Sequence, residues 1–163
     1  MTVWQAVARA KERWPGPVTP AGIFESVGFD QKDVFSALDR MLYEQSIPKT
    51  DDTAGAAISG LMYGLQAGMV VQEAITGEAT SIPRHLSVYL VAVSVSARWP
   101  IPMSSEDVIK SVGFDLEDVF RVLNHMLAEL GIPSTDDTRD AAVISFRYGL
   151  RAGMVLQEAA PRA

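Results

Sequence analysis

A ten-residue stretch occurs twice in this chain. Residues 26–35 read SVGFDQKDVF and residues 111–120 read SVGFDLEDVF, 85 positions later. The same offset aligns the whole of residues 1–78 with 86–163 without a gap, including WP, IP, TDDT and the tails YGLQAGMVVQEA and YGLRAGMVLQEA. An internal period on this scale indicates that a structural unit was copied whole. We therefore expect two tandem units, residues 1–78 and 86–163, joined by a linker at 79–85 and packed as a pseudo-symmetric pair.

Each unit begins with a pattern that predicts two helices. Trp-Pro ends the first helix in both units, because proline cannot continue the hydrogen-bond ladder. The corresponding segment of the second unit, LSVYLVAVSVSARWP, is rich in β-branched residues and would also suit a strand, but its matching position favours a helix. Thr19 in one unit, and Ser104 or Ser105 in the other, can cap a short second helix.

Two further helices follow in each unit. Asp30 and Asp115 lie where an N-cap belongs. In the first unit, Asp30 precedes apolar residues at helical spacing: Val34, Phe35, Leu38, Met41 and Leu42. Ile-Pro ends this third helix, and TDDT opens a fourth, which Thr50 or Asp51 can cap. The unit is thus predicted to be all-α with four helices, and the chain with eight.

The second and third helices resemble the helix-turn-helix core of the winged-helix and related superfamilies. The segments that carry the resemblance are IFESVGFDQKDVFSAL and VIKSVGFDLEDVFRVL, with a glycine at the turn, an apolar Phe29 or Phe114 after it, and a polar cap. The resemblance covers about a quarter of each unit and identifies no single family. It implies a helix-turn-helix-like core and, by extension, DNA binding through the third helix.

The charges argue against the DNA-binding part of that implication. The first turn of the third helix in the second unit carries three carboxylates, Asp115, Glu117 and Asp118, and no cation. The chain has 20 acidic and 14 basic side chains, a net charge of -6. Carboxylates placed against phosphates repel them, so the sequence supports a helix-turn-helix-like fold better than it supports DNA binding.

Small residues recur every four positions along the fourth helix. The residues of this stripe are Gly60, Gly64 and Gly68 in the first unit and Ser145, Gly149 and Gly153 in the second. Glycine inside a helix costs about 1 kcal/mol relative to alanine, so the stripe indicates a close approach of backbone to something. Either the two fourth helices cross closely, or the stripe receives a tryptophan of a first helix.

The fourth helix of the first unit also has the composition of a membrane-spanning helix, because residues 53–72 carry no charge. The matching stretch of the second unit contains Arg139, Asp140, Arg147 and Arg151, which a bilayer centre would disfavour. We expect a buried helix in a cytoplasmic protein and no membrane partner.

Nothing in the sequence indicates an enzyme. The chain has no cysteine, no phosphate-binding glycine loop, no HExxH and no serine elbow. His85 falls in the linker and His125 matches Arg40 in the other unit, so neither is a repeated base. The TDDT aspartates suit helix capping better than a metal. We predict no catalytic residues, no metal and no cofactor.

The leading hypothesis is a non-enzymatic protein-interaction or regulatory module whose partner is another protein. The expected contact surface is the exposed side of the third helices, where the units differ: Gln31, Lys32, Ser36 and Asp39 against Leu116, Glu117, Arg121 and Asn124. The alternative is a DNA-binding transcriptional regulator, followed by an acidic mimic of DNA. The sequence leaves open a homodimer and a small-molecule pocket between the units.

Overall fold

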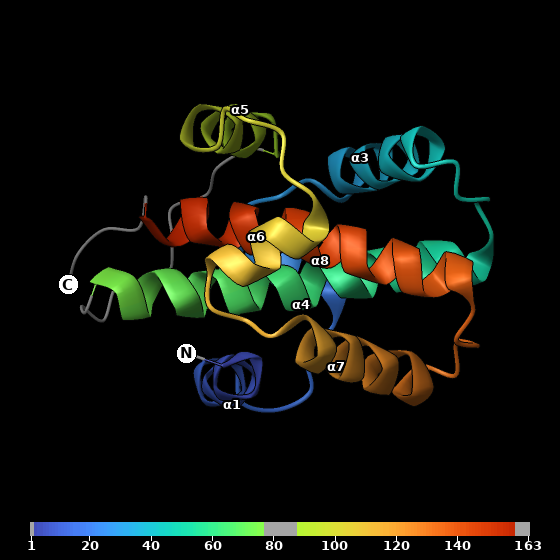
Figure 1. Cartoon of the computed structure of the whole chain (residues 1–163), viewed down its shortest axis with the longest axis horizontal. Coiled ribbons are helices and arrows are strands. Elements are labelled where there is room, and N and C mark those ends of the chain that lie inside the picture. Colours follow the sequence, from blue (N-terminus) through green and yellow to red (C-terminus); the bar gives the residue numbers. More distant parts are fainter. Residues whose placement is uncertain (1, 77–87, 159–163) are drawn as a thin grey trace.

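The computed structural model describes residues 2–76 and 88–158, so the predicted linker at 79–85 and its His85 lie outside the described residues. The described residues form eight α-helices and no strand (Figure 1). The helices are α1 (Val3–Arg13), α2 (Pro20–Ser26), α3 (Gln31–Glu44), α4 (Asp51–Thr76), α5 (Val88–Arg98), α6 (Ser105–Ser111), α7 (Leu116–Glu129) and α8 (Asp136–Glu158). The all-helical prediction is confirmed, including a helix rather than a strand for the β-branched segment of α5.

Local capping residues fix where most of these helices begin. Thr19 accepts a hydrogen bond from the Gly22 backbone N–H at 3.1 Å, and Ser104 accepts one from that of Asp107 at 3.1 Å. Asp30 caps α3 through the Lys32 N–H at 2.8 Å. Each side chain satisfies a backbone donor that the first helical turn leaves without a partner. Asp115 occupies the N-cap of α7 but makes no such hydrogen bond.

Backbone geometry at two turns depends on residues that tolerate a positive φ. Gly28 has a φ of 81° where α2 turns into α3. The α3 to α4 turn places Ser46 at a φ of 57°, and the residue 85 positions later, Gly131, has a φ of 69°. A left-handed conformation is strained for a residue with a Cβ, so Ser46 carries a strain that Gly131 avoids.

The two longest helices, α4 and α8, lie side by side along the middle of the molecule (Figure 1). The glycine stripe of α4 faces the backbone of α8 rather than a tryptophan. A Cβ on Gly60 would stand 2.6 Å from the Ala142 carbonyl oxygen, and one on Gly149 would stand 2.5 Å from that of Leu61. Such distances are too short for any side chain, so glycine is what allows these two helices to touch.

Helices α1, α3, α5 and α7 flank this central pair on two sides, and α6 lies over it (Figure 1). In Figure 1, α3 and α5 lie above it, while α1 and α7 lie below. Helix α1 contacts α7 as well as α4, and α5 contacts α8. Segments from the two ends of the sequence are therefore neighbours on both sides of the molecule.

The core is apolar and continuous, with Phe24, Leu65, Phe146 and Leu150 among its fully buried side chains. One helix, Asp51–Ile75, is long and apolar enough by length and composition to cross a membrane, and 78% of its most apolar window is buried inside the protein. Its burial against the other helices accounts for that composition in the fold.

Candidate functional site

The polar positions that distinguish α3 from α7 are mostly exposed, as a contact surface requires. The exposed ones are Gln31, Lys32, Ser36, Asp39, Glu117, Arg121 and Asn124. Leu116 differs, because it is only partly exposed and packs against the core. An apolar side chain in the first turn of α7 can lean onto the core while its polar neighbours stay in water.

The structure does not bring these two sets of residues together. Helices α3 and α7 lie on opposite sides of the central pair (Figure 1). Several of the side chains are also engaged within their own half, since Lys49 pairs with Asp39 at 2.9 Å and Arg121 with Asp118 at 3.2 Å. No single flat partner can cover both faces at once.

Helix α5 presents an apolar face to solvent. Leu90 is 57% exposed and Val93 is 67% exposed, and Ala97 is also exposed. These positions follow a spacing of three and four residues, so they form one stripe along the helix. The residues 85 positions earlier, on α1, are Gln5, Ala8 and Glu12.

A groove of about 480 Å³ lies between α3 and α5, with α8 beneath it. Most of its lining is apolar. The apolar residues are Phe29, Val34, Ala37, Leu38, Met41, Leu61, Val88, Val91, Ala92, Val95 and Ala152, together with the rings of Trp99 and Tyr148. Arg40 and Glu44 of α3 also line it and pair with each other at 3.4 Å, while Asp33, Ser36, Ser96 and Arg151 complete the polar lining.

The two sides of the molecule differ in how closely their helices pack. On the other side of the molecule α1 packs against α7 more extensively than α5 does against α3. Helix α1 carries the small, buried Ala6 and Ala10, whereas α5 has Val91 and Val95 at the matching positions. Ala37 of α3 is exposed and lines the groove.

Arg151 stands at the groove among aromatic rings. Its guanidinium carbon lies 5.9 Å from the Trp99 ring centre and 6.0 Å from that of Tyr148. Burial lowers the pKa of Arg151 from its ordinary value, and the neighbouring charge of Arg147 lowers it further. Both effects disfavour the charged form, so an anion at this place would relieve them.

Arg147 is held in place one turn earlier on α8. Its Nη1 donates to the Met103 carbonyl oxygen at 3.1 Å, and its guanidinium lies 4.6 Å from the Tyr148 ring centre. Within residues 2–76 and 88–158, neither Arg147 nor Arg151 forms an ion pair, and the Nε of each is buried without a hydrogen-bond partner.

In the sequence, Arg147 and Arg151 argue against a membrane span but indicate no function of their own. A signal was nevertheless present, because the residues 85 positions earlier are Met62 and Gln66. Arg147 and Arg151 are thus two cations, four residues apart, that only one half of the sequence carries. Folding alone does not require this difference.

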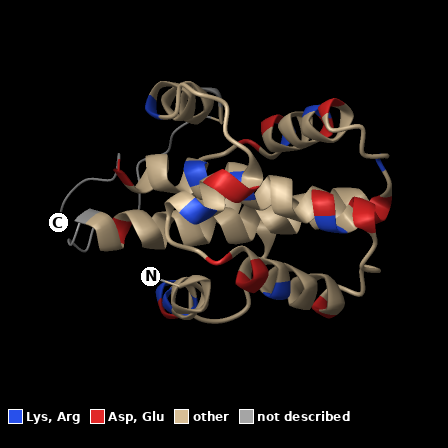
Figure 2. Cartoon of the chain, viewed as in Figure 1, with Lys and Arg blue, Asp and Glu red and all other residues tan. Residues whose placement is uncertain are grey.

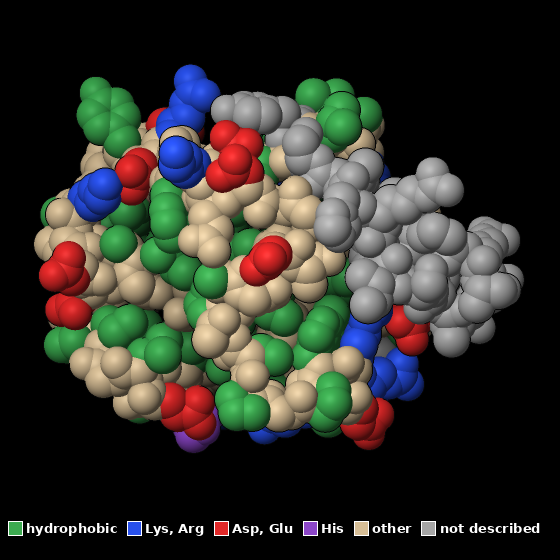
Figure 3. Space-filling model, turned by 180° about the vertical axis from the view of Figure 1, so that it is seen from behind, with side chains coloured by type: hydrophobic (Ala, Val, Ile, Leu, Met, Phe, Trp, Pro, Cys, Tyr) green, Lys and Arg blue, Asp and Glu red, His purple; other side chains and the backbone are tan. Residues whose placement is uncertain are grey.

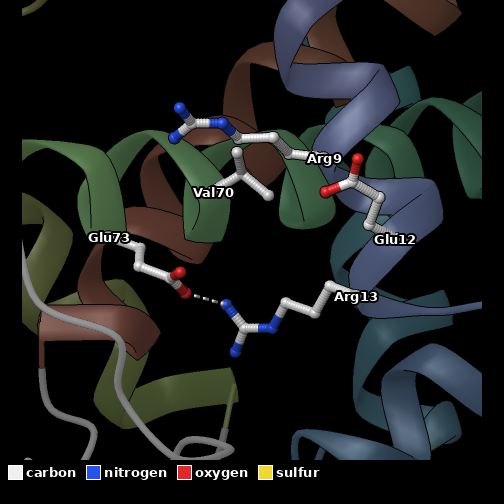
Figure 4. Close-up of a pocket in the computed structure, with 5 residues that line it drawn as sticks. All are labelled: Arg9, Glu12, Arg13, Val70 and Glu73. Atoms are coloured by element: carbon white, nitrogen blue, oxygen red, sulfur yellow. Dashed lines mark hydrogen bonds and ion pairs between the residues drawn. The ribbon is translucent and has the colours of Figure 1, made fainter.

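A second, more polar pocket of about 450 Å³ lies between α1 and α4 (Figure 4). Its lining consists of Arg9, Glu12, Arg13, Val70 and Glu73. Arg13 and Glu73 form an ion pair at 3.0 Å across it, and burial lowers the pKa of Arg13 while Glu73 opposes that shift. Arg98 and Glu158 form the corresponding pair between α5 and α8 at 2.6 Å, so this contact secures a first helix to a central helix.

The TDDT segments act as caps in the structure. Thr50 Oγ1 accepts from the Thr53 N–H at 3.1 Å, and Thr53 Oγ1 donates to the Pro48 carbonyl oxygen at 2.7 Å. Thr135 and Thr138 repeat the arrangement. Among the described residues, no three His, Asp or Glu side chains are grouped so that they could hold a metal ion.

Charges of both signs are spread over the helices (Figure 2). On the face turned away in that view, acidic and basic side chains lie mostly around the rim, and apolar side chains show between them (Figure 3). His125, on α7, is exposed and lies 2.9 Å from Glu129. Comparisons of the chain with protein-family models, with curated proteins and with solved structures found no match.

Proposed function

We propose that the chain is a non-enzymatic protein-interaction module, built from a duplicated four-helix unit with a helix-turn-helix-like core. Its two halves form a pseudo-symmetric pair in this proposal. The matching lengths of successive helices support it, with 11, 7 and 14 residues in α1 to α3 and again in α5 to α7. The crosswise neighbours, α1 beside α7 and α5 beside α3, are those that a twofold arrangement produces (Figure 1).

The observation that carries the proposal is the exposed apolar face of α5. Two copies of one folding unit need the same core, but they do not need the same surface. Helix α5 exposes Leu90 and Val93 where α1 exposes Gln5 and Ala8. Because Leu90 is 57% and Val93 is 67% exposed, a partner that completed their burial would gain about 1–2 kcal/mol from each. Binding energy is therefore available at this face.

The spacing of the face indicates what kind of partner fits it. Leu90, Val93 and Ala97 lie at intervals of three and four residues, which is the seam that one helix offers to another. The small Ala97 lets a second helix approach closely at that end. The partner we propose is therefore another protein that presents an amphipathic helix.

DNA reading is the weaker candidate for this fold. The first turn of α7, which would enter a groove in a helix-turn-helix complex, carries Glu117 and Asp118. Arg121, the nearest cation on that helix, is already paired with Asp118. Phosphate binding would have to overcome this local negative charge.

Introducing a carboxylate into the seam, and the same change at a matched position on α1, tests the proposal. The protein is used to capture partners, and each captured protein is purified and titrated directly against wild type, Val93→Asp and Ala8→Asp. Position 8 is exposed on α1 at the place that matches position 93. We expect Val93→Asp to weaken binding at least tenfold, because a carboxylate would be desolvated in the seam, and Ala8→Asp to leave it unchanged.

Equal binding by both variants would contradict the α5 surface. Loss of binding only after Leu116→Asp with Arg121→Glu would place the contact on α7 instead. Sedimentation of wild type as a concentration-dependent dimer that Val93→Asp abolishes would show that the face serves self-association rather than a different protein.

A further inference from the structure

The groove between α3 and α5 has a composition that the protein-interaction proposal does not require. It follows α3 from Asp33 to Glu44, a length of about 16 Å, and its lining is mostly apolar. Its volume falls within the range of small-molecule sites, which are mostly apolar with a few placed polar groups. Here the placed polar group is Arg151 of α8.

The charge of Arg151 is not compensated within the described part of the chain. No ion pair reaches it, its neighbour Arg147 repels it, and its Nε is buried without an acceptor. The aromatic faces of Trp99 and Tyr148 give it partial stabilisation only. A half-buried guanidinium of this kind is suited to an anion, because a guanidinium offers a fork of donors to a carboxylate.

The rest of the groove restricts what that anion can be attached to. Ala37 and Ala92 are exposed along it, and no charged residue other than Asp33, Arg40, Glu44 and Arg151 lines it. Arg40 and Glu44 neutralise each other on the α3 wall, and Asp33 lies on that same wall. A polar or branched polar ligand would find few partners there, whereas an apolar chain would be well accommodated.

We propose that the α3–α5 groove binds an acyl carboxylate, with the carboxylate on Arg151 and the apolar chain along α3 and α5. The opposite side of the molecule offers an internal contrast. There α1 closes onto α7, and the residue that matches Arg151 is Gln66. The pocket described beside α1 is lined mainly by charged residues, whereas the groove beside α5 combines an apolar lining with Arg151.

Calorimetric titration of the full chain with three probes that share one apolar chain tests the head-group assignment. The probes are dodecanoate, dodecanol and dodecyltrimethylammonium, each kept below the concentration at which it aggregates. We expect dodecanoate to bind at least tenfold more tightly than the neutral alcohol, and the cation to bind most weakly. Equal affinity for all three would overturn the role of Arg151.

Two pairs of variants locate the site. Arg151→Gln installs the residue that the chain already carries at position 66, and we expect it to weaken dodecanoate binding at least tenfold without affecting dodecanol. Arg139→Gln is its control, since Arg139 lies on the same helix but is exposed and paired with Asp136. Ala92→Trp should abolish binding of both probes by filling the groove, while Ala97→Trp, outside the groove lining, should not.

Each outcome decides the matter provided that the variants fold, which circular dichroism and thermal unfolding establish. Ala37→Leu supplies a milder filling substitution from the opposite wall if Ala92→Trp unfolds. Dodecanoate binding that survives both filling substitutions would overturn the site. Binding to vesicles of anionic lipid without binding of monomeric dodecanoate would also overturn it, because a bilayer surface cannot enter the groove. Failure here leaves the α5 protein contact untouched, since Val93 does not line the groove.

Discussion

Gly64 of α4 and Gly149 of α8 face each other where the two central helices meet, and a Cβ on either would lie 2.9 Å from the other's Cα. Gly60, Gly68 and Gly153 extend the same contact along the helices. The contact joins residues from the two ends of the chain in one core. It is therefore the place where a single added methyl group should have the largest effect on folding.

Gly64→Ala should destabilise the protein by about 1–3 kcal/mol, although alanine is the better helix former. The new Cβ would meet the Phe146 carbonyl and the Gly149 backbone, neither of which can rotate away. Chemical denaturation measures the change in the free energy of unfolding.

Gly55→Ala on the same helix is the matched control. Its Cβ would meet only the tip of the Ile132 side chain at 3.2 Å, and that tip can move. We expect no loss, or a gain of up to about 1 kcal/mol from helix propensity. Equal destabilisation by the two substitutions would contradict the close crossing of α4 and α8.

Substitutions at position 46, in the turn from α3 to α4, and at the matching position 131, in the turn from α7 to α8, should change the free energy of unfolding in opposite directions. Ser46→Gly should stabilise the protein by about 0.5–1 kcal/mol, because it removes a left-handed serine at a small entropic cost in the unfolded chain. Gly131→Ser should destabilise it by a similar amount. Nothing lies within 4 Å of a Cβ at position 131, so conformation alone is tested. A change in the midpoint of thermal unfolding that has the same sign for Ser46→Gly and Gly131→Ser would contradict this prediction.

Stability should fall at alkaline pH because of Tyr63. Burial raises the pKa of Tyr63 from its ordinary 10.0, and the charge of Glu129 raises it further. Above pH about 10 the phenol of Tyr63 ionises in the unfolded chain but stays neutral in the folded protein. The contribution of Tyr63 to the free energy of unfolding is therefore complete below pH about 10 and is lost as the pH rises through the pKa of the folded state.

Comparison of wild type with Tyr63→Phe between about pH 9 and pH 11 isolates this contribution. Wild type should lose more unfolding free energy over that interval than the variant, and Tyr43→Phe, at a side chain that is 86% exposed, serves as the control. Identical pH profiles of unfolding free energy for wild type and Tyr63→Phe would contradict a raised pKa of Tyr63 in the folded protein.

Much of the secondary structure could be predicted because its causes are local. A Trp-Pro step, Thr19 ahead of Pro20, and Asp30 ahead of an apolar stripe are each read from a few neighbouring residues. Periodicity was less reliable for burial, since Phe35 belongs to the predicted apolar pattern of α3 yet is 43% exposed. A side chain at the edge of a helical stripe is buried only if a neighbouring helix reaches it.

The groove could not be predicted, because it depends on which helices become neighbours. Helical spacing shows which face of α5 is apolar, but not that α3 lies across a groove from it. Arg151 shows the same limit, since its lack of an acidic partner appears only once the helices are packed. Differences between the two halves of the sequence were the one available signal for both features.

Amide hydrogen exchange, measured on the protein alone and bound to its purified partner, locates the binding surface on the helices. We predict protection on binding at residues 90–98 of α5, with residues 5–13 of α1 exchanging as in the free protein. Protection confined to α3 or α7, or spread equally over α1 and α5, would contradict the account that the exposed apolar face of α5 is the binding surface.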